Sequence, residues 1–249
     1  MSAPAPWAAA ARAQSAMELR LTARRGENLL AIVVIPTVVL VFFATSSLVT
    51  VPGPSAVDFL LPGTMALAVI AAGLVNLSIA TAYERSYGVL KRLGGSPLGR
   101  TGLMTAKVVA IAVIVALQTV LLVAVATVVL DWRPGAGFAP AIIVLALALG
   151  TVTFTALGLL LAGTLRAEAT LALANALFIA ALLLGGIIVP TSSLPPILAT
   201  IADVLPAAAL SEALRGGFGG AGDLARPFVV LLAWGVGAGF ATVRTFRWD

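Results

Sequence analysis

The chain has 249 residues, of which 61% are hydrophobic and 10% charged, and its formal net charge is +5. A mean hydropathy of +1.11 excludes a water-soluble domain of this length. The sequence contains no cysteine and no histidine, which excludes disulfides, thiolate metal sites and the commonest general base and zinc ligand. The chain is therefore predicted to be an integral membrane protein.

Residues 1–28 are predicted to form a cytoplasmic tail. Arg20, Arg24 and Glu27 fall on one helical face and Met17 and Leu21 on another, as in an amphipathic helix lying on the inner membrane surface. A solvated basic tail is the alternative. The apolar run that follows is longer than the core of a cleavable signal peptide, so we expect it to be retained as an anchor.

The rest of the chain, residues 29–249, is predicted to be one all-α transmembrane domain. A transmembrane helix needs roughly 20 apolar residues. Six stretches meet this requirement: residues 29–49, 59–82, 103–130, 138–163, 169–190 and 227–246. Their apolar residues are continuous rather than alternating, which is typical of spanning helices.

The distribution of basic residues predicts the orientation. With both termini in the cytoplasm, 12 of the 15 lysine and arginine residues, Lys107 among them, fall in cytoplasmic segments. Arg133, Arg215 and Arg226 remain outside, and this asymmetry follows the positive-inside rule. Basic loops beside anionic lipid account for the isoelectric point near 10.7, so no nucleic-acid partner is expected.

The predicted span interiors contain no carboxylate. Carriers driven by an ion gradient usually hold the coupling ion on such a group near the midplane, so a secondary transporter is disfavoured. The carboxylates elsewhere form no cluster with a nucleophile, and no catalytic or metal site is predicted. Asn76, Gln118 and Asn175 are candidates for lining a pathway, and hydrogen bonding between helices is the alternative for each.

The largest cytoplasmic loop, residues 83–107, contains a helical pattern. Val89, Leu90 and Leu93 lie three or four residues apart, and Arg85 and Arg92 lie seven apart, which predicts a short amphipathic helix from Arg85 to Leu93. We interpret it as a docking element for a cytoplasmic partner, and a linker helix on the membrane surface is the alternative.

Two substitutions follow from this interpretation. Glu84 and Arg92 are expected to lie outside the apolar core. Glu84→Ala or Arg92→Glu is therefore predicted to abolish coupling to a partner without unfolding the bundle.

An apolar run breaks at Pro190 and gives way to two short helical patterns before the last span. Ser193 is expected to cap the first helix, with Pro195 or Pro196 in its first turn. Pro206 opens the second, which reaches about Arg215 and stops at two glycines. The segment either dips into the membrane beside a pathway or caps the bundle as an interfacial loop. Glu212 and Arg215, three residues apart, are expected to pair in a structural role.

Two motifs of the chain resemble the permease subunits of ABC type-2 exporters, a family that includes daunorubicin-resistance and other drug, lipid and polysaccharide exporters. The first motif, which resembles the coupling-helix region of that family, contains Glu84, Arg85, Gly88, Leu90, Arg92, Leu93, Ser96, Pro97 and Leu98. The second, which resembles the segment before the last span, contains Gly186, Pro190, Ser193, Leu194, Pro195, Leu205, Pro206, Glu212, Ala213, Leu214 and Arg215. Leu61-Pro62-Gly63 at the start of the second span also fits the family.

The resemblance implies a mechanism. Two permease chains, as a homodimer or heterodimer, form the pathway, and two ATPase chains that bind ATP and Mg dock on the cytoplasmic face. The chain has no Gly-x-x-x-x-Gly-Lys-Ser/Thr loop, so ATP hydrolysis falls to the partner and this chain binds no cofactor. By the same resemblance, the first motif and the helix near Met17–Glu27 dock on the ATPase. The outer gate is formed by Pro190, Leu194, Pro195, Leu205, Pro206, Glu212 and Arg215.

The expected function is export of a hydrophobic or amphipathic substrate, such as a drug, antibiotic or lipid-like molecule, across the cytoplasmic membrane of a bacterium. Multidrug efflux is one form of this expected function. The alternatives are export of a lipid or polysaccharide precursor, a carrier that works without ATP, and a membrane scaffold.

Overall fold

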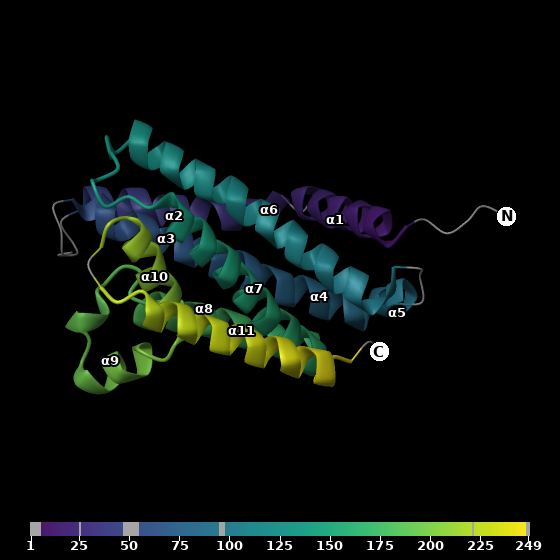
Figure 1. Cartoon of the computed structure of the whole chain (residues 1–249). Coiled ribbons are helices and arrows are strands. Elements are labelled where there is room, and N and C mark those ends of the chain that lie inside the picture. Colours follow the sequence, from purple (N-terminus) through teal and green to yellow (C-terminus); the bar gives the residue numbers. More distant parts are fainter. Residues whose placement is uncertain (1–5, 25, 47–54, 95–97, 221, 248–249) are drawn as a thin grey trace.

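The structure is a computed structural model that describes residues 6–24, 26–46, 55–94, 98–220 and 222–247. Every regular element in these ranges is a helix, and the long helices lie side by side in one bundle (Figure 1). They are α1 (Trp7–Arg24), α2 (Gly26–Thr45), α3 (Ala56–Ile70), η1 (Ala71–Asn76), α4 (Leu77–Ser86), α5 (Val89–Gly94), α6 (Gly99–Val128), α7 (Pro140–Thr164), α8 (Ala167–Leu184), η2 (Thr191–Ser193), α9 (Pro196–Ala202), α10 (Pro206–Gly217) and α11 (Ala225–Thr245).

The two ends of the bundle carry different short helices. One end holds α5, together with α1 and the C-terminal end of α11, and the other holds α9 (Figure 1). We call them the α5 end and the α9 end.

Among the described residues, five helices are long and apolar enough to cross a membrane, and they correspond to the second to sixth predicted spans. They are α3 continued through η1 into α4, then α6, α7, α8 and α11. The first predicted span corresponds to α2, whose 20 residues reach about 30 Å. Residues 47–49 of that prediction lie outside the described residues. The prediction of an all-α, multi-pass membrane protein is confirmed.

The second span departs from a regular α-helix near its middle. Residues Ala71–Asn76 form a π-helical segment between α3 and α4. At this level the backbone comes close to α7, because an added Cβ at Gly158 would meet the carbonyl oxygen of Gly73. Nearly every side chain of α3 is buried, so this broken span is the central helix of the core. π-Helical segments of this kind are frequent at functional sites.

The fifth span ends earlier than predicted. α8 stops at Leu184, whereas the apolar run continues to Pro190. Gly186 takes the left-handed conformation, with φ +63°, which glycine adopts without strain and which turns the chain out of the helix. Hydrophobicity alone therefore overestimated the length of this helix.

The segment before the last span forms two short helices, as predicted, and they are bent by 78° from one another. Pro196 and Pro206 each occupy the first turn of their helix, where a missing N–H costs nothing. The expected cap by Ser193 is wrong: this residue ends the turn η2, and its hydroxyl donates to the carbonyl of Pro190 at 2.7 Å. The N-cap residue of α9 is Pro195, which makes no side-chain hydrogen bond to the helix.

Helix α1 begins at Trp7, well before the amphipathic pattern that starts at Met17. It packs against α6, and Ala11 joins a small apolar cluster with Leu90, Leu98 and Leu103. The predicted apolar face divides, because Met17 is 49% exposed whereas Leu21 lines a crevice inside the protein. The side chain of Glu27 lies outside the described residues.

Candidate functional site: a charged junction at the α5 end and an intramembrane groove

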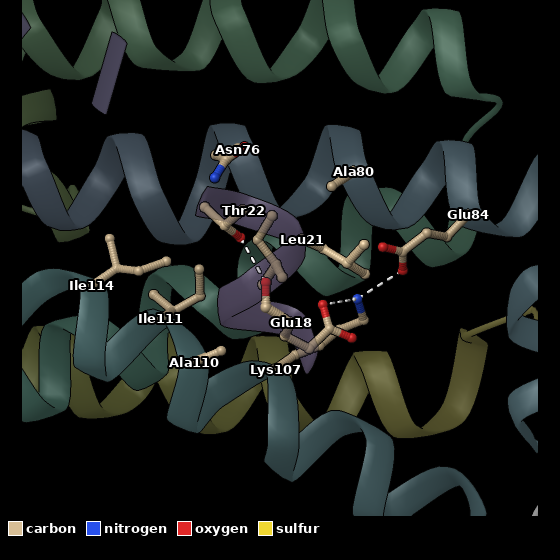
Figure 2. A pocket seen from close by; sticks show the side chains of 11 residues that line it. Glu18, Leu21, Thr22, Asn76, Ala80, Glu84, Lys107, Ala110, Ile111 and Ile114 are labelled. Carbon is tan, nitrogen blue, oxygen red and sulfur yellow. Dashed lines mark hydrogen bonds and ion pairs between the residues drawn. The ribbon is translucent and has the colours of Figure 1, made fainter. Parts of the chain in front are cut away.

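A lysine is buried where α1, α4 and α6 meet. Lys107, on α6, is only 2% exposed, and its Nζ lies 2.8 Å from Oε2 of Glu84 and 3.2 Å from Oε2 of Glu18 (Figure 2). Glu84 comes from the last turns of α4 and Glu18 from α1. Because a buried charge is costly unless it is paired, the lysine holds both helices against α6.

The charged cluster borders a small crevice. Its volume is about 30 Å³, room for about one water molecule, and its lining includes Leu21, Thr22 and Asn76 besides the three charged residues. The hydroxyl of Thr22 donates to the carbonyl of Glu18, one turn earlier on α1. Figure 2 shows Asn76 at the far side of the crevice from the charges, on the π-helical segment.

Asn76 also lines a larger groove on the other side of η1. The groove has a volume of about 250 Å³, and α2, η1, α4 and α8 contribute the lining residues Ile32, Ile35, Ala71, Val75, Asn76, Ile79, Asn175 and Phe178. Its walls are apolar apart from the two asparagine amides. Asn175 donates to the carbonyl of Leu171 on its own helix, and no hydrogen bond of the Asn76 amide is found among the described residues.

Gln118, the third candidate for a pathway residue, does not line this groove. It is 2% exposed, and its amide donates to the backbone carbonyl of Ile32 on α2. Its Oε1 is buried without a hydrogen-bond partner. The position corresponds to the alternative in which a polar residue ties two spanning helices together.

The predicted docking helix from Arg85 to Leu93 is in fact two helices. α4 continues to Ser86 and α5 starts at Val89, with Gly88 between them at φ +71°, a conformation that breaks the helix. Arg85 therefore belongs to the spanning helix. Its guanidinium donates to the carbonyl of Ala162 at 2.7 Å and to that of Leu165, so it caps the C-terminal end of α7.

The residues of this motif face in two directions. Leu90 is fully buried and Leu93 is partly buried, whereas Lys91 and Arg92 are exposed and Tyr87 is 73% exposed. Glu84 is not part of the apolar core, as expected, but it is only 14% exposed and pairs with the buried lysine, so it is not a free surface residue. Arg92 is exposed, as expected. Ser96 and Pro97 lie outside the described residues.

At the α9 end, α10 holds the loop that follows α8. The hydroxyl of Ser211 donates to the carbonyl of Gly185, and Arg215, one turn later, donates to that of Gly186. The Arg215 guanidinium also lies 3.9 Å from the ring centroid of Phe59 on α3. The predicted pair of Glu212 with Arg215 is wrong: the ion pairs among described residues are those of Lys107 and one between Arg226 and Asp203. Arg215 instead donates to the backbone carbonyl of Gly186 and lies against the Phe59 ring.

The remaining residues of the expected gate shape this loop. Pro190 and Leu194 flank the turn η2, Pro195 and Leu205 directly precede α9 and α10, and Pro206 is the first residue of α10. The loop approaches α3 closely, because an added Cβ at Gly63 would meet the carbonyl oxygen of Ile187. This contact gives a physical reason for the glycine of Leu61-Pro62-Gly63.

A family model described as ABC-2 type transporter matches residues 12–218, which is most of the chain. The chain belongs to the ABC-2 type transporter family. The resemblance inferred from the two motifs is thereby confirmed, and the chain is a multi-pass permease, a transport subunit rather than an ATPase domain. Permeases of this family work with an ATPase subunit. No curated protein matches the chain.

Sequence reasoning missed two members of the charged junction of this ABC-2 permease. Glu18 lies in the predicted tail, and Lys107 was counted with the cytoplasmic residues although it falls within the predicted span 103–130. An ionisable residue inside a span marks a functional site by default, and this signal pointed to Lys107. Its partners were not identifiable, because they lie 23 and 89 residues away along the chain.

Proposed function

We propose that the chain is the permease of an ATP-driven exporter that moves a hydrophobic or amphipathic substrate out across the cytoplasmic membrane of a bacterium. The groove between α2, η1, α4 and α8 supports this proposal most directly. It is apolar with two neutral amides, and such a site suits a drug-like, antibiotic-like or lipid-like molecule better than a charged polymer.

The coupling route in this proposal begins at the α5 end, which faces the cytoplasm. A partner ATPase, present in two copies, binds the exposed surface formed by Tyr87, Lys91 and Arg92. A displacement of α5 moves α4, to which it is joined at Gly88. The ion pairs of Lys107 with Glu84 and Glu18 then transmit the displacement from α4 to α6 and α1. Asn76 lies between the charged junction and the groove, so the same displacement changes the groove.

Two copies of the permease complete the pathway, as a homodimer. The groove is open along α2 and α8, whose outward faces carry exposed apolar side chains such as Val38, Phe42 and Ile179. At the α9 end, the loop held by Arg215 and the two short helices act as the outer gate. Release of the Gly186 carbonyl by Arg215 opens it.

Co-purification tests the proposal. The tagged chain is extracted from its native host in mild detergent, bound proteins are identified by mass spectrometry, and ATP hydrolysis is measured on the eluate. A stoichiometric soluble ATPase is expected with the wild type, and Arg92→Glu should lose it. Arg133→Glu, the same charge reversal on the exposed loop between α6 and α7, should keep it. An ATPase that binds both variants equally places docking elsewhere, and no ATPase with the wild type contradicts the exporter proposal.

A further inference from the structure

A second groove, apolar apart from one indole N–H, runs between α8 and α11 over α7. It consists of two adjoining cavities of about 160 Å³ and about 340 Å³, which share Leu157, Leu160 and Trp234 in their walls. The larger is completed by Ala233, Gly237 and Ala238 of α11, and the smaller reaches Leu205 at the break between α9 and α10. None of its lining residues lines the groove that holds Asn76.

The chemistry of the lining excludes water as the occupant. At roughly 30 Å³ per molecule the space would hold several waters, but each would need two to four polar partners. Trp234 carries the only polar side-chain group in the lining, and its indole N–H already donates to the carbonyl of Val204 at 2.8 Å. Any occupant of this groove must therefore present hydrocarbon to its walls.

A pair of opposite charges lies at the α9 end of this groove. Arg226, in the first turn of α11, lies 2.7 Å from the carboxylate of Asp203, and both side chains are about half exposed, at 49% and 46%. Asp203 directly precedes Val204 and Leu205 in the chain, so the pair borders the wall of the groove. An exposed cation beside an exposed anion complements a headgroup that also carries both charges. A purely anionic headgroup would meet Asp203, and a purely cationic one would meet Arg226.

The length of the groove matches one leaflet of a bilayer. From Arg226 to Ala238 along α11 the rise is about 18 Å at 1.5 Å per residue. Half of a typical hydrocarbon core is about 15 Å. A lipid with its headgroup at Arg226 therefore has acyl chains long enough to pass Trp234 and reach Ala238.

We propose that this groove binds one zwitterionic phospholipid of the leaflet at the α9 end, with a phosphate and a primary ammonium in its headgroup. The phosphate lies by Arg226, the ammonium by Asp203, and one acyl chain occupies the space between α8 and α11. The lipid fills the gap between the last span and the break between α9 and α10. This site is independent of the export function proposed above.

The test measures which lipid stays with the purified full-length chain. The protein is exchanged into micelles that contain equal amounts of phosphatidylethanolamine and phosphatidylglycerol, washed in lipid-free detergent, and examined by native mass spectrometry and lipid extraction. We expect retained phosphatidylethanolamine in excess of phosphatidylglycerol. Equal retention of both lipids, or none of either, overturns the proposal.

Two glycines of α11 provide a matched pair of variants. Gly237 lines the groove and Gly239 does not, and an added Cβ meets nothing within 4 Å at either position, so a side chain can start from either residue without a collision at its first atom. Gly237→Leu should lose the lipid, and Gly239→Leu should keep it. Retention by Gly237→Leu contradicts the proposal. A second outcome also contradicts it. If the wild type carries no lipid and has the mass of a dimer, while Gly237→Leu has the mass of a monomer, the groove holds a second copy of the chain.

The headgroup assignment has its own variant. Asp203→Asn removes the anion at the rim and leaves the apolar walls intact. The excess of phosphatidylethanolamine over phosphatidylglycerol should disappear, because nothing at the rim then disfavours a purely anionic headgroup, while Asp131→Asn, the same change on another exposed loop of the same end, should preserve it. Unchanged selectivity in Asp203→Asn overturns the assignment of the headgroup to this pair.

Discussion

Replacement of Lys107 by methionine is expected to destabilise the permease strongly. Methionine keeps most of the length of the side chain but removes its charge, and the carboxylates of Glu18 and Glu84 then face each other. Their exposed fractions are only 12% and 14%, so water screens them poorly. Helix α1 loses its charged attachment to the bundle, and the loss should appear as a lower free energy of unfolding.

The size of the effect follows from the geometry. Both carboxylates lie within 3.2 Å of the same ammonium nitrogen. Two like charges about 4–6 Å apart repel by roughly 3–4 kcal/mol at an effective dielectric constant of about 20. Breaking a buried ion pair by removing one partner typically costs about 3–5 kcal/mol, which agrees. For a chain of this size, a loss of about 3–4 kcal/mol lowers Tm by about 6–16 °C.

The assay is thermal unfolding of the full chain in mild detergent, followed by circular dichroism. Lys107→Met should lower Tm by the amount above, and Lys91→Met, an exposed lysine of α5, should leave it unchanged. The triple variant Lys107→Met, Glu18→Gln and Glu84→Gln should recover most of the loss, because a neutral hydrogen-bonded cluster no longer contains an unpaired charge. The reasoning is refuted if Lys107→Met melts with the wild type, or if the triple variant melts no higher than the single one.

Two further substitutions test the packing at opposite ends of the bundle by the same thermal assay. Gly63→Ala should cost about 1–3 kcal/mol, because the added methyl group collides with the backbone carbonyl of Ile187, whereas Gly135→Ala has open space and should not destabilise; equal melting of the two variants would contradict the close approach. Arg85→Met should cost about 1.5–3 kcal/mol, because the carbonyls at the end of α7 lose a charged donor, and the exposed Arg92→Met should melt like the wild type.

Glu84 illustrates why the choice of a mutation that tests coupling depends on the structure. Judged by its place in a polar loop, Glu84 is a surface residue whose loss would affect only a partner. In the fold it neutralises a buried lysine, so Glu84→Ala changes stability as well as any coupling. Arg92, which is exposed, remains the cleaner test of docking.

Local chain properties determined where the spanning helices of this protein lie in the sequence. A backbone in lipid must satisfy its own hydrogen bonds, so each long apolar run becomes a helix, and five of the predicted spans match observed helices apart from their ends. Pro196 and Pro206 likewise indicated where the two short helices begin, because a missing N–H costs nothing in a first turn. These outcomes depend on neighbouring residues alone.

Only the tertiary structure decided the charged and polar contacts. Lys107 finds Glu18 89 residues away, Gln118 finds a carbonyl 86 residues away, and Arg85 caps a helix 77 residues away. Each of these polar groups is costly to bury without a hydrogen-bond or ion-pair partner, and many groups could serve as that partner. The local sequence therefore shows that a partner is needed but does not identify it. The packing of α1, α4 and α7 against their neighbours makes that choice, because burial removes water as an alternative and leaves only the groups that the fold has brought within reach.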